Sequence, residues 1–140
     1  MKNCKPILLV EDDDVDAMTV RRAFKELKIS NSLIRSVNGE EALKYLKDQS
    51  NETPCVILLD LNMPKMNGIE FLKVAKADDE LRQIPVVVLT TSKADEDIVK
   101  TYNLHANAYI TKPVDLNRFV EIMHALEEFW FTIVKLPPKE

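Results

Sequence analysis

A run of apolar residues that ends in a single aspartate constrains this chain more than any other stretch. Residues 55–59 are all apolar, and Asp60 ends the run. A short apolar run without alternation is typical of a strand that is buried on both faces, as in parallel sheets. In open parallel sheets, reactive groups collect at the carboxyl ends of the strands. Asp60 is therefore expected at a position suited to chemistry.

Strand and helix patterns alternate along the whole chain. We expect strands at residues 7–10, 33–37, 56–59, 84–89 and 108–111. Apolar residues at three-to-four spacing predict helices around residues 17–27, 39–46, 69–75 and 98–102, and a long final helix over about 115–134. This alternation favours the α/β class, with a single doubly wound, five-stranded parallel sheet.

Length, composition and charge limit the classes of function. A chain of 140 residues with 46% hydrophobic and 30% charged residues is expected to form one globular domain. The net charge of −4 and the lack of a Lys/Arg cluster argue against nucleic-acid binding. The beginning of the chain predicts neither a signal peptide nor a membrane span, so we expect a cytoplasmic protein with Cys4 and Cys55 as reduced thiols. With two glycines, the chain has no glycine-rich loop for a nucleotide.

Polar side chains follow four of the five expected strands. They are Glu11 and Asp12 after the first strand, Asp60 after the third, Thr90 after the fourth and Lys112 after the fifth. Right-handed crossovers would bring these strand ends to one edge of the sheet. Three neighbouring carboxylates repel one another and need a cation, and Mg²⁺ (or Mn²⁺) binds carboxylates together with water and phosphate oxygens. The set predicts a phosphoryl and divalent-metal site around a nucleophilic Asp60.

Each of these residues alone has a simpler explanation. Acids directly before a helix are often caps or dipole partners, which applies to Asp13 and Asp14. An isolated strand-end aspartate such as Asp60 can cap a turn, Thr90 is a good strand former, and Lys112 can be a solvated surface residue. The functional interpretation depends on the joint occurrence of these residues in this order.

Four motifs resemble the receiver domain of two-component response regulators, which has the CheY-like, flavodoxin-like (βα)5 fold. They are Leu8-Leu9-Val10-Glu11-Asp12, Leu58-Leu59-Asp60-Leu61-Asn62-Met63-Pro64 with Gly68, Val88-Leu89-Thr90-Thr91, and Tyr109-Ile110-Thr111-Lys112-Pro113. The resemblance covers residues 5 to about 128. It implies a receiver domain over residues 1–128 and a C-terminal helical extension and tail over residues 129–140, without an output domain.

The resemblance assigns a metal and a phosphoryl group to this site. It implies that Asp60 accepts a phosphoryl group from a phosphohistidine of a sensor histidine kinase or a histidine phosphotransfer protein. Asp12, Asp60 and the backbone carbonyl of Asn62 would bind Mg²⁺ directly, and Glu11 would bind it through water. Such a domain catalyses only its own phosphorylation and dephosphorylation and is not otherwise an enzyme.

The resemblance also assigns the residues that sense the phosphoryl group. Thr90 and Lys112 would contact its oxygens. Tyr109 would be an aromatic switch that turns inward when Thr90 moves. The peptide bond between Lys112 and Pro113 is often cis in such domains.

Two alternatives from other classes remain to be weighed. A phosphatase of the haloacid-dehalogenase type also uses a strand-end aspartate with Mg²⁺, but it places a second aspartate two residues later as acid and base. This chain has Asn62 at that position, and an amide cannot do that work. The other alternative is a receiver that has lost phosphotransfer and acts as a non-phosphorylated interaction module. The joint presence of Asp12, Asp60, Thr90 and Lys112 argues against it.

The expected last helix is apolar on more than one side. Residues off its main apolar stripe include Phe129, Phe131 and Val134, with Trp130 on the stripe. A second apolar side needs a second surface, and we expect homodimerisation or kinase docking through these four residues. The alternative is that the tail packs on its own domain. The run from 128 to 138 resembles the tail of stand-alone regulators that are paired with phytochrome-type kinases.

Overall fold

The protein is described by a computed structural model, which covers residues 5–26, 31–61, 66–90, 106, 108–111, 118 and 121. Its strands are β1 (Ile7–Val10), β2 (Leu33–Ser36), β3 (Val56–Asp60), β4 (Val86–Thr90) and β5 (Ala108–Thr111). Its helices are α1 (Asp14–Glu26), α2 (Gly39–Lys47), α3 (Gly68–Ala77) and the short 3₁₀ helix η1 (Leu81–Gln83). The predicted α/β class is confirmed.

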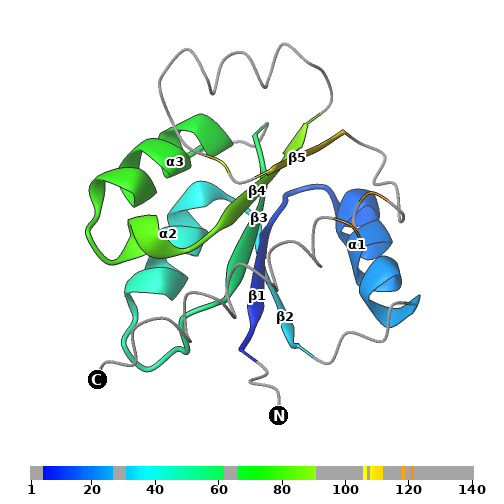
Figure 1. The fold of residues 1–140 in the computed structure, drawn as a ribbon, viewed down its shortest axis with the longest axis horizontal. Helices are drawn as coiled ribbons and strands as arrows, with labels where there is room; N and C mark the ends of the chain where they lie inside the picture. The colour runs from blue at the N-terminus through cyan, green and yellow to red at the C-terminus, as the bar shows by residue number, and fades with distance from the viewer. Residues whose placement is uncertain are drawn as a thin grey trace.

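The five strands form one parallel sheet in the order β2-β1-β3-β4-β5. The chain moves from β1 outward to β2 and then crosses back to β3 on the other side of β1. Because crossovers between parallel strands are right-handed, this reversal places α1 on one face of the sheet and α2 and α3 on the other (Figure 1). The predicted doubly wound arrangement is therefore present in this part of the chain.

Alternate residues of the central strands enter two separate apolar cores. In β3, Val56 and Leu58 belong to the core beside α1, whereas Ile57 and Leu59 belong to the core beside α2 and α3. The helices contribute Ala17, Val20 and Phe24 to the first core and Ala42, Phe71, Leu72 and Ala75 to the second. This two-sided burial explains why the strands read as continuous apolar runs.

The edge strand β2 is only partly buried, since its first three residues are half-buried and only Ser36 is buried. The predicted start of the fourth strand at Ile84 was two residues early, since β4 begins at Val86. The η1 turn comes first, and the amide of Ile84 donates to the carbonyl of Leu81 at 3.1 Å. Pro85 has no N–H to offer to a neighbouring strand.

Several predicted features lie outside the described residues. These are the helix around 98–102, Cys4, most of the final helix, and the four residues Phe129, Trp130, Phe131 and Val134. Within the predicted final helix the structure describes Arg118 and Glu121, which are both helical. Nη1 of Arg118 lies 3.9 Å from Oε1 of Glu121.

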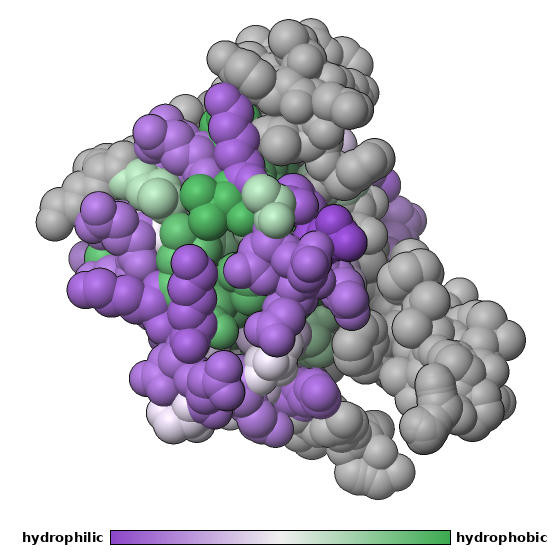
Figure 2. Space-filling view, turned by 90° about the vertical axis from the view of Figure 1, so that its left-hand side faces the viewer, coloured by the Kyte–Doolittle hydropathy of each residue, from purple (hydrophilic) through white to green (hydrophobic). Residues whose placement is uncertain are grey.

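The face that carries α2 and α3 is mainly hydrophilic, with a small apolar area at its centre (Figure 2). Partly buried side chains of both helices, such as Leu43, Leu46 and Ile69, pack onto the core below. Within the described ranges, no helix is long and apolar enough to cross a membrane.

Candidate functional site

The end of β1 brings two acids of different exposure to the carboxyl edge of the sheet. Glu11 is fully buried, and its amide donates to the carbonyl of Ser36 at 3.0 Å, which continues the pairing with β2. Asp12 is exposed. One carboxylate is thus fixed inside the edge while its neighbour faces solvent.

Asp60 is the last residue of β3 and is 2% exposed. Its partner in the adjacent strand is Leu89. The amide of Gly68 donates to the carbonyl of Leu61 at 3.1 Å, and a Cβ on Gly68 would lie 2.6 Å from the carbonyl oxygen of Asp60. Only glycine allows the start of α3 to approach Asp60 this closely.

Glu11, Asp12 and Asp60 form one acidic cluster. One carboxylate oxygen from each residue can be chosen so that all three lie within 4.8 Å of one another. Like charges at this separation are unfavourable without a cation, and a hard divalent ion prefers oxygen ligands of this kind. The cluster suits a divalent metal, as the sequence predicted.

Asp13 and Asp14 have other roles. Asp13 is the N-cap of α1, since its Oδ1 accepts from the amides of Val15 at 2.8 Å and Asp16 at 3.0 Å. Asp14 is the first helical residue, and its Oδ1 lies 2.9 Å from Nη1 of Arg35. The simpler explanation, that an acid before the helix acts as its cap, is confirmed for Asp13. Neither Asp13 nor Asp14 belongs to the acidic cluster.

The structure describes the other predicted site residues only in part. The backbone of Thr90 pairs with Thr111 at the end of β4, one residue beyond the level of Asp60. The side chain of Thr90, and all of Asn62 and Lys112, lie outside the described residues. Tyr109 pairs with Val88, is half-buried and packs against the core beside α2 and α3.

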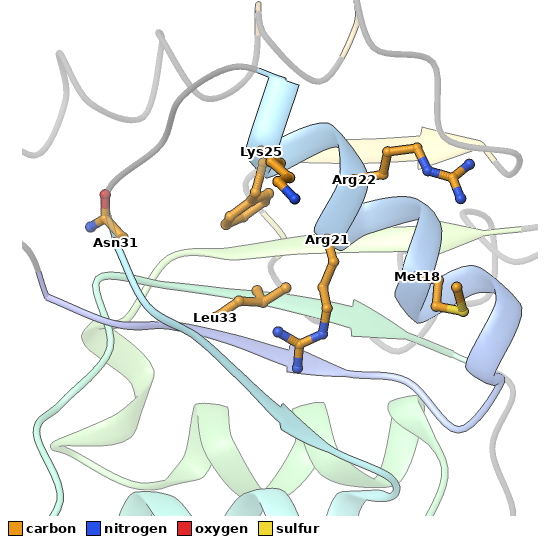
Figure 3. A pocket seen from close by; sticks show the side chains of 7 residues that line it. Met18, Arg21, Arg22, Lys25, Asn31 and Leu33 are labelled. Carbon is orange, nitrogen blue, oxygen red and sulfur yellow. The ribbon is translucent and has the colours of Figure 1, made fainter.

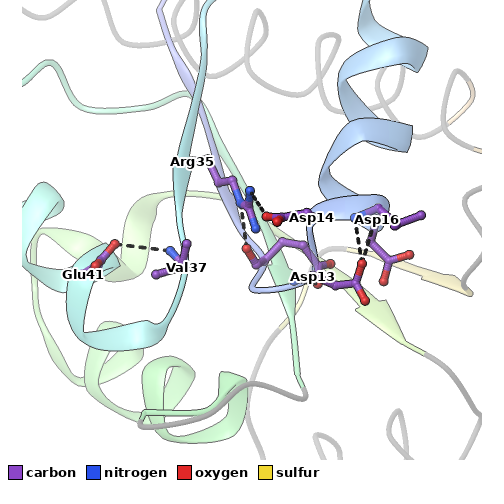
Figure 4. Close-up of polar contacts among 8 residues, drawn as sticks. Asp13, Asp14, Asp16, Arg35, Val37 and Glu41 are labelled. Atoms are coloured by element: carbon purple, nitrogen blue, oxygen red, sulfur yellow. Dashed lines mark hydrogen bonds and ion pairs between the residues drawn. The ribbon is translucent and has the colours of Figure 1, made fainter.

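Sequence reasoning missed Arg35, which reaches from β2 to the loop before α1 (Figure 4). Its Nε donates to the carbonyl of Glu11 at 2.9 Å, in addition to the ion pair with Asp14. The available signal was a charged residue inside the short apolar strand pattern of residues 33–37.

One hollow among the described residues lies away from the acidic cluster. A groove of about 510 Å³ runs along α1 and β2, lined by Met18, Arg21, Arg22, Phe24, Lys25, Asn31 and Leu33 (Figure 3). None of the three clustered acids lines it, so the groove does not mark the acidic site.

The opposite, amino edge of the sheet carries the thiol of Cys55, which is a free cysteine as predicted. Burial raises the pKa of this thiol above its ordinary value. A half-buried thiol of raised pKa is a poor nucleophile, so Cys55 is a weak candidate for a reactive centre.

Comparisons with known proteins agree with the fold and the acidic cluster. Residues 7–124 match the response regulator receiver domain family. The chain is 40% identical to the response regulator Rcp1 of Synechocystis sp. over 137 residues, which cover 95% of this chain and 93% of Rcp1.

Two solved structures are also similar. The phosphorylated cyanobacterial phytochrome response regulator RcpA has a TM-score of 0.75 and 39% identity, over 96% of this chain and 99% of RcpA. The Mn²⁺-bound form of response regulator Rcp1 has a TM-score of 0.73 and 39% identity, over 95% of this chain and 99% of that chain.

A parallel sheet with three carboxylates at its carboxyl edge, together with these matches, defines a signalling module of two-component systems. The chain belongs to the response regulator receiver domain family. This family is a signalling family and not a family of hydrolases, so the phosphatase alternative finds no support in the matches.

Proposed function

We propose that this protein is a phosphoacceptor of a two-component system and that Asp60 is the residue phosphorylated. One observation carries the proposal: Asp60 is 2% exposed at the end of β3, and it shares a 4.8 Å cluster with the two acids that follow β1. A single carboxylate at a strand end has structural explanations, whereas three converging carboxylates need a cation. RcpA is phosphorylated and Rcp1 binds Mn²⁺ in the similar structures, which supports the same chemistry here.

The reaction needs no separate base. A carboxylate oxygen of Asp60 attacks the phosphorus of a phosphohistidine, the P–N bond breaks, and its electron pair stays on the imidazole nitrogen. The histidine leaves as a neutral imidazole because its other ring nitrogen carries a proton. Hydrolysis of the aspartyl phosphate by water later releases inorganic phosphate and restores the carboxylate. A bound divalent ion would neutralise charge at the phosphoryl oxygens. The protein thereby catalyses only its own phosphorylation and dephosphorylation.

Each clustered acid has its own task in this proposal. Asp12, which is exposed, and Asp60 would hold the ion directly together with the backbone carbonyl of Asn62. Glu11 is buried behind Asp12 and would hold it through water. A metal held by few protein ligands keeps positions open for phosphoryl oxygens.

The state of Asp60 would reach the surface through the neighbouring strands. Thr90 ends β4 at the same edge as Asp60, and Lys112 comes next in the sequence after Thr111, the last residue of β5. Both would contact the phosphoryl oxygens. Tyr109, half-buried on β5, would turn inward when Thr90 moves, and this would shift a two-state equilibrium.

The partners follow from the family. In the cytoplasm, where we expect this protein, the phosphoryl donor would be a sensor histidine kinase of the phytochrome type or a histidine phosphotransfer protein, supported by the likeness to a phytochrome response regulator. The receiver domain would occupy residues 1–128, and residues 129–140 would extend a C-terminal helix. This helix would use Phe129, Trp130, Phe131 and Val134 for a homodimer or for kinase docking.

Phosphorylation by acetyl phosphate tests the proposal without a kinase. With Mg²⁺ present, intact mass should show one added phosphoryl group on the wild-type protein and none on Asp60→Asn. Asp79→Asn is the matched control, since Asp79 is 88% exposed and pairs with Arg82 away from the cluster. It should label like the wild type. Full labelling of Asp60→Asn would refute Asp60 as the acceptor.

A further inference from the structure

Residues 11–13 between β1 and α1 form a loop of three acids, called the acidic loop below. Arg35 connects the edge strand β2 to both ends of this loop. It lies in β2 opposite Leu9, and its side chain is 20% exposed. Nε donates to the carbonyl of Glu11 at 2.9 Å, and Nη1 donates to Oδ1 of Asp14 at 2.9 Å (Figure 4). Glu11 ends the strand side of the loop and Asp14 begins α1, so one guanidinium spans the whole connection over residues 11–13.

The loop has further internal contacts that make this span effective. The amide of Asp13 donates to Oε2 of Glu11 at 3.2 Å, and Asp13 caps α1. With Arg35 fixing the carbonyl of Glu11, the backbone from Glu11 to Asp13 has few ways to rotate. The direction of the Glu11 and Asp12 carboxylates is thereby tied to the position of a planar, rigid group.

The position of Arg35 is costly for a simple surface ion pair. Its Nη2 is buried and has no hydrogen-bond partner among the described residues. A surface pair with an 88% exposed Asp14 contributes little and does not require a buried guanidinium. The hydrogen bond from Nε of Arg35 to the carbonyl of Glu11 explains why the guanidinium is buried.

Electrostatics alone predicts the opposite role. A cation beside three carboxylates repels a divalent ion, so removing its charge should tighten metal binding. If Arg35 instead positions the acids, its removal should weaken metal binding. The sign of the change therefore distinguishes the two roles.

We propose that Arg35 is a positioning residue for the divalent ion, which aims the carboxylates of Glu11 and Asp12 toward Asp60. The inference rests on the proposed metal site of the preceding subsection. It assigns to β2, which contributes no ligand, control over metal affinity. Groups that orient metal ligands typically change affinity by roughly 10- to 100-fold when removed.

Mn²⁺ affinity tests this role, with free Mn²⁺ followed by electron paramagnetic resonance on the full-length protein at pH 7. Arg35→Met keeps the apolar stem and removes all donors, and we expect roughly 10-fold weaker binding. Arg35→Lys keeps the charge but not the two-pronged geometry, and we expect a loss of about 3-fold. Arg21→Met removes an equal charge from an exposed residue of α1 that lines the groove beside β2, and it should leave the affinity within about 2-fold of wild type.

The outcomes separate this inference from the metal site itself. Wild-type protein that binds no Mn²⁺ would refute the metal site and with it the role of Arg35. Wild-type binding with equal or tighter binding by Arg35→Met would overturn the positioning role only. A lower unfolding midpoint of the metal-free variant with unchanged Mn²⁺ affinity would mark Arg35 as merely structural and overturn it too. If Arg35→Met does not fold, Arg35→Lys decides, because its charge is unchanged: weaker binding supports the role and equal binding refutes it.

Discussion

The amino edge and the carboxyl edge of this sheet are built from the same five strands, but they handle polar groups differently. At the amino edge neutral groups bond to one another: Nδ2 of Asn31 donates to the carbonyl of Lys5 at 2.6 Å, and the amide of Cys55 donates to the carbonyl of Pro6 at 3.0 Å. At the carboxyl edge three carboxylates converge within 4.8 Å. These polar groups of the amino edge bond within the protein, whereas the carboxylates of the carboxyl edge are suited to binding an ion from solution.

The amino edge stabilises the fold, whereas the carboxyl edge carries the functional site. Polar groups that bond internally add stability, whereas clustered like charges reduce it until a ligand arrives. A receiver domain therefore has one edge that should be indifferent to metal and one whose stability depends on it.

The largest effect should come from metal at the carboxyl edge. At about 100 times the dissociation constant, Mg²⁺ should raise the free energy of unfolding of the wild type by roughly 2.7 kcal/mol, because it binds only the folded protein. In Asp60→Asn the metal-free protein should be more stable than the wild type, since one of three repelling charges is gone, and the response to Mg²⁺ should largely disappear. Urea unfolding with and without Mg²⁺ measures both.

The matched control for that experiment lies at the amino edge. Asn31→Ala removes the hydrogen bond to the carbonyl of Lys5 and should cost about 1 kcal/mol, with an unchanged response to Mg²⁺. An equal loss of the Mg²⁺ response in Asn31→Ala and Asp60→Asn would break the comparison between the two edges.

A somewhat smaller effect is expected at the turn behind Asp60. In Gly68→Ala the new Cβ would lie 2.5 Å from the Cα of Leu61 and 2.6 Å from the carbonyl oxygen of Asp60. Backbone atoms cannot move aside as a flexible side chain can, so we expect a loss of about 1–3 kcal/mol in urea unfolding. Because Asp60 moves with this turn, Mn²⁺ binding should weaken as well. A variant with wild-type stability would show that this close approach is unimportant.

The smallest effect concerns a carboxylate at the amino edge that depends on backbone amides. The amides of Leu81 and Glu80 donate to Asp78 and lower the pKa of its carboxyl group. Because the folded pKa lies below the unfolded one, this stabilisation is present above about pH 4 and is lost as the pH falls through the folded value.

Asp78→Ala tests this acid dependence. The stability difference between wild type and variant should be largest at neutral pH and should shrink below about pH 4, without any dependence on Mg²⁺. Urea unfolding at pH 7, 5 and 3 measures it. A difference that stays constant down to pH 3 would contradict the assignment.

Much of the fold was predictable because its signals are local. The run that ends at Asp60 is apolar at every residue because β3 contributes to both cores. This pattern is visible in the sequence even when the helices that pack on β3 are not known. The acidic cluster was predictable for a related reason, since parallel strands bring their carboxyl ends to one edge wherever the chain places them. The limits of the strands were less predictable, because the η1 turn before β4 depends on hydrogen bonds from the amides of Glu80 and Leu81 to the carboxylate of Asp78.

The role of Arg35 could not be predicted from pattern alone. Its contacts depend on which strand occupies the edge beside β1, and on the register that sets Leu9 opposite Arg35. Neither is encoded by residues near position 35. The separate roles of Asp12 and Asp13 were predicted, by contrast: Asp12 joins the acidic cluster and Asp13 caps α1.

The position of the phosphoryl group is the most direct test of the account. After reaction with acetyl phosphate and Mg²⁺, borohydride reduction converts an aspartyl phosphate to homoserine, and peptide mass spectrometry then locates it. We expect homoserine at position 60 alone, and no homoserine in a sample without divalent metal. Homoserine at position 12 or 13, or equal conversion at position 60 without metal, would contradict it.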